Sequence, residues 1–379
     1  MRGGYRKGAG RKSNNEKKIS KNIYLTPQLE NRLSELSISN CNSFNKKCIY
    51  LLEKGLESIN NERESLEMTE KLKFIDLFAG IGGIRRGFED DNTLCVFSSE
   101  WDKFAQQTYK ANYDELPKGD ITQIEASSIP SHDVLLAGFP CQPFSMIGKR
   151  EGFTHKTQGT LFFDVLKILN FHMPKMFLLE NVLGLLTIQG GETFKIIIKS
   201  LEEAGYKVFF DVLDAQNYML PQVRKRVVIV GFREDLGIDE FNFPEGNKDS
   251  RFPIGKILEA NVKGYSISKH LQDSYLFKKN DNKPQVVDKN STIQVKTLVA
   301  SYHKIQRLTG TFVRDGETGI RLFSELECKR LMGFPDNFAV PVSRTQMYRQ
   351  FGNSVAVPMI KAVADEMKVK LSQTVTETY

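Results

Sequence analysis

The sequence is poor in cysteine, and this scarcity excludes several kinds of site. Its five cysteines, at positions 41, 48, 95, 141 and 328, form an odd set without a CxxC pair, so neither a disulfide framework nor a zinc site is supported. We therefore expect any important cysteine to act as a thiol, and we expect no metal. No apolar run approaches the roughly 20 residues that cross a bilayer, and the basic start lacks the apolar segment of a secretory signal. The expected location is the cytoplasm of a prokaryotic cell.

Acidic residues are scarce at the start of the chain. Glu16 is the one acidic residue among the first 21, which hold eight lysines and arginines, and the net charge of the whole chain is +7. Residues 1–18 are therefore predicted to be a disordered basic tail suited to phosphate contacts. The charge is compatible with a polyanionic partner but does not identify one.

From residue 71 onward, short β-rich apolar runs alternate with amphipathic stretches, which predicts an α/β domain with a mostly parallel sheet and helices on both faces. Strands are expected at 72–78, 94–98, 134–138, 176–179, 208–213 and 227–232. Helices are expected at 102–112, 160–171 and 192–204. The alternation of strand and helix patterns stops after about residue 235, where the sequence becomes polar and one further strand is expected at 292–299. Helical patterns return at 324–332 and from 354 onward. We therefore expect one domain, 71–235 and 320–379, interrupted by an inserted region at 236–319.

The segment 19–60 is predicted to be a separate module of strand, helix and helix. An alternating run at 19–25 leads into Thr26 and Pro27, a favourable N-cap followed by proline at the first helical position. Leu29, Leu33 and Leu36 mark one face of the first helix. A second helix is expected after Ser43 and should end near 55–59, and residues 61–70 are interpreted as a charged linker.

A glycine-rich loop follows the first predicted strand, with the sequence AGIGG at 79–83. A loop with few side chains at the carboxyl edge of a sheet is typical of a ligand site, although it also fits a tight packing turn. Glu100 and Trp101 end the next strand, where a carboxylate can bind ribose hydroxyls and an indole can stack on adenine. A single tryptophan can equally fill a core. Asp120 could accept from an adenine amino group, and the loop departs from the GxGxxG spacing of nicotinamide enzymes.

Three reactive side chains are predicted to meet at one rim of this sheet. Cys141 stands between prolines at a strand end, a poor place for a buried apolar cysteine. Glu180 ends the following strand, and Arg224 and Arg226 precede the last one. A glutamate in such a place is often merely solvated, and an Arg-Lys-Arg run is often a basic surface. The convergence of a thiol, a carboxyl group and a guanidinium favours chemistry.

From residue 71 to about 370 the chain resembles the C5-cytosine DNA methyltransferase family, whose motifs it carries in the family's order. These motifs are DLFAGIGG at 76–83, GFPCQPFS at 138–145, ENV at 180–182, QVRKR at 222–226, RLFSELECKRLMGFPDNF at 321–338 and QFGNSVAVP at 350–358. The resemblance implies the fold of S-adenosylmethionine-dependent methyltransferases, and it identifies 236–319 as the target-recognition region. One departure is Gln158, where the family often has arginine in the mobile loop after the cysteine.

The resemblance also implies a mechanism and a set of site residues. Cys141 would add to C6 of a flipped-out cytosine, Glu180 would bind N3 and the amino group, and Arg226 would bind O2 with Arg224 as support. The implied S-adenosylmethionine site consists of Phe78, Ala79, Gly80, Ile81, Gly82, Glu100, Trp101, Asp120, Ile121, Pro140, Leu161, Asn353 and Ser354. The implied contacts to double-stranded DNA on this domain are Gln142, Ser145 and Gln222.

Residues 19–59 resemble a ribbon-helix-helix DNA-binding module. This would pair two chains and direct Ser20, Asn22 and Tyr24 toward bases, and it raises the hypothesis that the enzyme represses its own promoter. A small dimerisation or packing extension is the alternative, and the catalytic domain itself is expected to act as a monomer. The leading interpretation is the modification enzyme of a restriction-modification system. A tRNA cytosine methyltransferase, or a transcription regulator with a vestigial catalytic half, remains open, as does the target sequence.

Overall fold

The computed structural model describes residues 25–38, 41, 43–140 and 161–376. They belong to two compact units that divide between Thr69 and Glu70. The first unit contains α1 (Pro27–Glu35) and α2 (Phe44–Glu70), whose last residue reaches the second unit. The second unit contains every other helix and strand named below.

Both helices of the first unit begin where the sequence predicts. The side chain of Thr26 accepts from the backbone N–H of Leu29, and Pro27 opens α1. Lys47 of α2 donates to the carbonyl of Ser34 at 2.9 Å and so holds the two helices together. The expected end of the second helix near 55–59 was wrong, because α2 continues to Glu70. Residues 60–70 contain neither glycine nor proline and are rich in glutamate, which favours helix.

A six-stranded sheet is the framework of the second unit among the described residues, in the order β2-β1-β3-β4-β6-β5. Its strands are β1 (Leu72–Leu77), β2 (Thr93–Ser99), β3 (Val134–Ala137), β4 (Met176–Val182), β5 (Tyr206–Asp214) and β6 (Lys225–Arg233). The first four run parallel, whereas β6 is antiparallel to both of its neighbours. The start of β6 therefore lies at the same edge as the ends of β1, β3 and β4. The expected mostly parallel sheet is confirmed.

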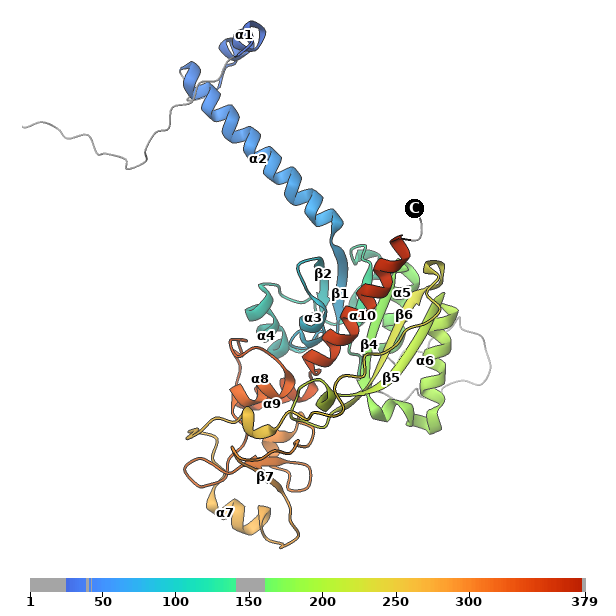
Figure 1. Ribbon diagram of the computed structural model, residues 1–379, viewed down its shortest axis with the longest axis vertical. Helices are drawn as coiled ribbons and strands as arrows, with labels where there is room; N and C mark the ends of the chain where they lie inside the picture. Colours follow the sequence, from blue (N-terminus) through green and yellow to red (C-terminus); the bar gives the residue numbers. More distant parts are fainter. Residues whose placement is uncertain (1–24, 39–40, 42, 141–160, 377–379) are drawn as a thin grey trace, which may run out of the picture. The chain divides into compact units, whose positions relative to one another are not determined.

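Helices cover both faces of this sheet (Figure 1). They are α3 (Gly83–Phe88), α4 (Lys103–Tyr113), α5 (Leu161–His172), α6 (Glu192–Glu203) and α10 (Val357–Thr376). Phe74 points into a core shared with α3 and α10, and its neighbour Ile75 points into a core shared with α5 and α6. This alternation follows from the two-residue period of a strand. The sheet is therefore buried on both faces. The loops discussed below follow the carboxyl ends of its parallel strands.

The predicted target-recognition region does not form a core by itself. It contains α7 (Lys269–Leu271), β7 (Gln285–Val287) and β8 (Thr311–Val313), and it is followed by α8 (Glu325–Met332) and α9 (Arg344–Asn353). Apolar side chains from both sides of residue 320 share one buried cluster. The expected strand at 292–299 was wrong, since only an isolated bridge joins Val295 to Gln222. The helix α9 was not expected from the sequence.

The end of the chain returns to the glycine-rich loop. A Cβ built on Gly83 would lie 2.5 Å from the Ser354 hydroxyl, and one on Gly87 would lie 2.8 Å from Ile360. Only glycine at these two positions allows α3 to pack so closely against Ser354 and α10. This packing confirms that the segment after α9 lies beside the first loop.

Candidate active site

The glycine-rich loop has a strained backbone at the end of β1. Phe78 has a φ of +54°, and Gly80 and Gly82 have φ values of +55° and +79°. Glycine adopts this region freely, but for phenylalanine it is unfavourable and persists only where surrounding contacts impose it. A Cβ on Gly80 would meet no atom within 4 Å. The loop is therefore open on one side, as a binding loop must be.

Glu100 anchors this loop to the end of β2. One oxygen of its carboxylate accepts from the backbone N–H of Gly80 at 2.8 Å, and the other accepts from that of Asp102 at 2.7 Å. Burial raises the pKa of Glu100, and these two hydrogen bonds oppose the rise. Both carboxylate oxygens are thus engaged, although each has a further lone pair for a ligand hydroxyl.

The other predicted cofactor residues lie around the same end of the sheet, with different degrees of burial. Trp101 follows Glu100 and is 76% exposed, so it is not core filler. Asp120 is exposed, and its Oδ1 accepts from the backbone N–H and the hydroxyl of Thr122. Backbone hydrogen bonds between the end of β2 and Lys118 bring this turn close to Glu100. Among the remaining residues, Pro140 and Asn353 are exposed, Leu161 and Ser354 are half-buried, and Ala79, Ile81, Gly82 and Ile121 are buried.

These features fit a nucleoside-bearing cofactor without phosphates. The fit rests on an open glycine loop, a fixed carboxylate and an exposed indole, and no basic side chain takes part in it. We find no group of three metal-ligating side chains in the part of the chain that the structure describes.

Glu180 and Arg226 form a buried pair at the same edge of the sheet. The Nε of Arg226 lies 2.9 Å from Oε1 of Glu180, and the two side chains are 12% and 10% exposed. This contact is an ion pair whose geometry falls short of a well-aligned hydrogen bond, so Arg226 is the partner of Oε1 in the described structure. Antiparallel pairing of β4 with β6 places Val182 opposite Arg226, and the guanidinium reaches back to Glu180.

Burial raises the pKa of Glu180, and the charges of Arg226 and Arg224 oppose the rise. A buried carboxyl oxygen without a hydrogen bond is costly, by about 1–3 kcal/mol for a typical polar group. The ion pair with Arg226 offsets part of this cost for Glu180.

The backbone that leads to Cys141 lies close to the carboxyl group of Glu180 at Gly138. A Cβ on Gly138 would lie 4.0 Å from Oε2 of Glu180. Asn181, which sequence reasoning missed, donates from Nδ2 to the carbonyl of Phe139 at 2.8 Å and is buried. It fixes the backbone two residues before the cysteine. The only sequence signal was its place beside Glu180 in the ENV motif.

Arg224 and Gln222 directly precede β6, and both side chains are fully buried. Arg224 is fully buried and donates to the carbonyls of Leu298 and Gly352 at 2.9 and 3.0 Å, and also to that of Ser354. It therefore supports the site rather than facing it. The predicted contact of Gln222 with DNA stays a prediction; in this structure its side chain is fully buried and its amide oxygen accepts from the backbone N–H of Leu298. Its amide nitrogen donates to the carbonyl of Leu331.

Several predicted residues cannot be placed. Cys141, Gln142, Ser145, Gln158, Ser20, Asn22 and Tyr24 lie outside the described residues.

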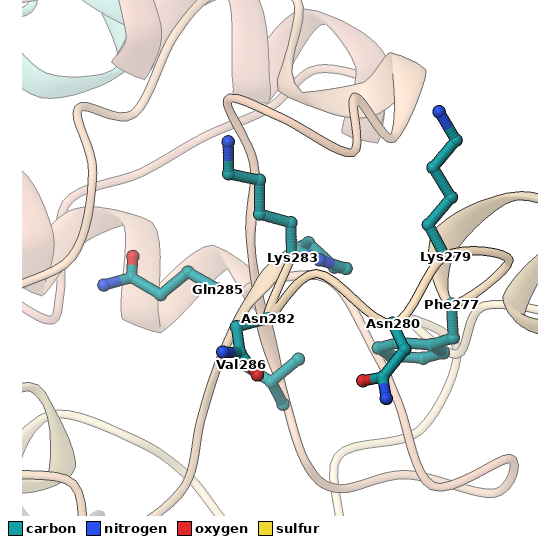
Figure 2. A pocket seen from close by; sticks show the side chains of 8 residues that line it. Phe277, Lys279, Asn280, Asn282, Lys283, Gln285 and Val286 are labelled. Carbon is teal, nitrogen blue, oxygen red and sulfur yellow. The ribbon is translucent and has the colours of Figure 1, made fainter.

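A separate hollow of about 560 Å³ lies in the predicted target-recognition region, and none of the strand-end residues line it. Its lining residues are Phe277, Lys279, Asn280, Asn282, Lys283, Pro284, Gln285 and Val286. Lys279 and Lys283 extend in the same direction beside it (Figure 2). Arg307 braces the loop beneath them by donating to the carbonyls of Leu276 and Lys283 and by pairing with Asp281. The acidic side chain of this loop, Asp281, is thereby paired with Arg307, and the charges of Arg307 and Lys283 both lower its pKa.

A family profile described as C-5 cytosine-specific DNA methylase matches residues 72–369. The chain belongs to this family. Its catalytic activity is accordingly methyl transfer to C5 of cytosine in DNA, and its second unit has the S-adenosylmethionine-dependent methyltransferase fold. Glu180 and Arg226 lie within the matched segment, and so do the glycine loop and Glu100.

Two curated relatives are similar over most of this methyltransferase. The type II methyltransferase M.BsuFI of Bacillus subtilis is 61% identical, with 98% of each chain covered. The type II methyltransferase M.MspI of Moraxella sp. is 57% identical over 79% of this chain and 71% of its own. A solved Dnmt2 methyltransferase of S. pombe shares 20% identity, with a TM-score of 0.63 over 80% of this chain and 99% of its own. This last likeness supports the fold alone.

Proposed function

We propose that this methyltransferase is the modification enzyme of a type II restriction-modification system and methylates a cytosine in a short duplex sequence. The observation that carries the proposal is the buried pair of a carboxyl group and a guanidinium, Glu180 and Arg226, 2.9 Å apart at the strand ends. This pair stands where a flipped-out cytosine would meet the segment leading to Cys141. Similarity to two type II methyltransferases supports the biological setting, and the cytoplasm is the expected location because the DNA is there.

The proposed chemistry divides one difficult step into easier ones. Cytosine C5 is a poor nucleophile, so the Cys141 thiolate adds to C6 and makes C5 enamine-like. Glu180 in its protonated form donates to N3, and Arg226 stabilises the negative charge that develops at O2. Bound S-adenosylmethionine supplies an electrophilic methyl group for C5. A water molecule then takes the C5 proton as base, the electron pair of that C–H bond re-forms the C5–C6 double bond, and the C6–S bond breaks to release the Cys141 thiolate.

The cofactor site is proposed at the end of the sheet that holds Gly80, Glu100 and Trp101. Glu100 would accept from the ribose hydroxyls, Trp101 would stack on the adenine ring, and Asp120 would accept from the adenine amino group. Ser354 and its neighbours would close the far side. This arrangement requires no metal.

Bisulfite sequencing of DNA from cells that express the chain tests this proposal, since it reports activity and target together. We expect one short sequence to retain cytosine completely, and cytosine unmodified throughout would refute the activity. Cys141→Ser should abolish methyl transfer while leaving cofactor affinity within about twofold of wild type, because the thiol acts on the base. Full activity of that variant would exclude the covalent route. A tRNA substrate is tested by bisulfite sequencing of RNA from the same cells.

We propose that residues 236–319 read the target and that their lysine hollow binds the DNA backbone. Lys283 contributes to a lowered pKa of Lys296, after the larger effect of burial. Like charges held together favour an anion between them. Replacing Lys279 and Lys283 by glutamine should weaken DNA binding without changing the sequence methylated. Each lost phosphate contact should reduce the slope of log K against log salt by about 0.9.

The matched control for the lysine pair is glutamine at Lys195 and Lys199 of α6, which also removes two exposed positive charges. A salt slope that falls equally in both double variants would show a general charge effect and would sink the proposal.

We also propose that residues 19–60 form a ribbon-helix-helix module that joins two chains and represses the enzyme's own promoter. Its helices carry large apolar side chains that remain exposed. They are Leu29, Phe44, Ile49, Tyr50, Leu52 and Leu56, and Leu36 directly after α1 is exposed as well. Such a patch is typical of an interface. Deletion of residues 1–62 should convert a dimer into a monomer in sedimentation experiments and remove the promoter footprint; an unchanged footprint would refute the repressor role.

A further inference from the structure

The carbonyl of Gly82 in the glycine-rich loop is held by a tyrosine from α4. The hydroxyl of Tyr113 donates to this carbonyl at 2.8 Å. Its ring lies so close to the loop that a Cβ on Gly82 would be 2.3 Å from Tyr113 Cε2. Glycine is thus required at position 82 for two reasons. Its φ is +79°, and a side chain there would occupy the space of the Tyr113 ring.

Arg85 of α3 fixes the ring of Tyr113 from the other side. Its guanidinium carbon lies 4.3 Å from the centroid of that ring, a cation–π distance. Arg85 also donates to the Tyr109 hydroxyl at 2.9 Å and pairs with Glu89 and Glu115 at 2.9 and 2.7 Å. Although it carries a charge, Arg85 is only 8% exposed. The arginine is therefore locked, and it leaves the tyrosine little freedom to turn.

This cluster is tied to the sheet as well as to the helices. Glu115 accepts from the hydroxyl of Ser98 in β2, the strand that Glu100 directly follows. Glu100 in turn holds the other end of the loop at Gly80. The loop is consequently pinned at Gly80 by a carboxylate and at Gly82 by a phenol, and both groups depend on β2 and α4.

We propose that Tyr113 is a positioning residue for the cofactor, with Arg85 as its support. Neither residue touches the proposed ligand. They hold the strained loop open before the cofactor arrives, so that its ordering does not have to accompany binding. The proposal rests on the cofactor site described under the proposed function.

Tyr113→Phe removes the hydroxyl and keeps the ring. The full-length variant should bind S-adenosylmethionine roughly 3- to 10-fold more weakly, the equivalent of one typical hydrogen bond. The turnover number at saturating cofactor should stay within about twofold of wild type. Affinity is measured by titration of the fluorescence of Trp101, the single tryptophan, without DNA.

Tyr206→Phe is the matched control, because its buried hydroxyl also donates to a backbone carbonyl, that of Pro174, at 2.9 Å. It lies at the start of β5, and we expect unchanged cofactor affinity. Wild-type affinity in Tyr113→Phe would overturn the proposal, as would an equal loss of affinity in both variants. If the wild-type protein binds no S-adenosylmethionine, the cofactor site itself fails and the positioning role falls with it.

Arg85→Lys tests the support. The lysine keeps the charge but cannot stack and bridge in the same way, so cofactor affinity should fall in this variant too. Combined with Tyr113→Phe, it should add little, because both changes release the same contact. Fully additive losses would show that Arg85 acts elsewhere.

Discussion

Two glutamates at the same end of the sheet are equally buried but differ in the groups that bind their carboxyl oxygens. Glu100 and Glu180 are each 8% exposed, and burial raises the pKa of both. Glu100 accepts a backbone N–H on each oxygen. Glu180 is instead held by an ion pair with the side chain of Arg226 at 2.9 Å.

The difference shows that burial alone does not identify a reacting carboxyl group. The bonding of Glu100 is complete before a ligand arrives, which suits an anchor that shapes a cofactor loop. Glu180 is held by a side chain and not by the backbone, which suits a group that exchanges a proton or hydrogen bond with a substrate. The cofactor side is thus fixed by the backbone, whereas the base side is held by a pair of side chains.

The largest expected effect comes from glutamine at each position. Glu180→Gln should reduce the turnover number by about 10²- to 10⁴-fold, the usual contribution of a positioned acid. Its cofactor affinity should stay within about twofold of wild type. Glu100→Gln should do the reverse, because an amide nitrogen placed against a backbone N–H disturbs the loop. Single-turnover rates and equilibrium titrations with S-adenosylmethionine separate the two quantities.

Each glutamine variant is the control for the other, since both remove one buried carboxylate from the same sheet edge. A large loss of turnover in Glu100→Gln with unchanged cofactor affinity would reverse the comparison.

A smaller effect is expected in the pH dependence. If the protonated form of Glu180 acts, activity is lost as pH rises through its folded-state pKa, which lies above that of an ordinary glutamate. The permanently neutral Glu180→Gln should lack this basic limb in its residual rate. A carboxyl group with a raised folded pKa contributes stability that is complete below its unfolded pKa and is lost as pH rises through the folded value. The free energy of unfolding of Glu180→Gln, measured with urea, should therefore change less between these two pKa values than that of the wild type. A pH–rate profile of Glu180→Gln that matches the wild type would exclude Glu180 as the titrating group.

Much of this framework is predictable because it depends on local patterns. Each of the six strands of the main sheet begins and ends within a few residues of its prediction, since apolar runs bounded by turns are a local signal. The convergence of Glu180 with Arg226 was also predictable, because Glu180 lies near the end of one strand and Arg226 near the start of the strand paired with it.

The contacts that were missed depend on partners far away in the chain. Gln222 is polar and next to a basic run, which favours exposure, yet it is buried against Leu298 and Leu331. Tyr113 looks like an ordinary member of an amphipathic helix, and nothing local shows that its hydroxyl bonds to Gly82. The segment 292–299 is apolar enough for a strand but has only one isolated bridge. Such roles are set by tertiary packing and not by propensity.

The smallest expected effect concerns the backbone beneath the nucleophile. Asn181→Ala leaves the carbonyl of Phe139 without its 2.8 Å hydrogen bond, which should lower the free energy of unfolding by about 1–3 kcal/mol. Because Cys141 follows two residues later, we also expect turnover to fall by roughly 5- to 10-fold, the rate equivalent of about 1 kcal/mol. Asn112→Ala is the control: Asn112 bridges the carbonyls of Thr108 and Ala339 on the cofactor side, so its loss should reduce stability and spare turnover. Equal turnover in both variants would mean that Asn181 only stabilises the fold and that the base side needs no support of its own.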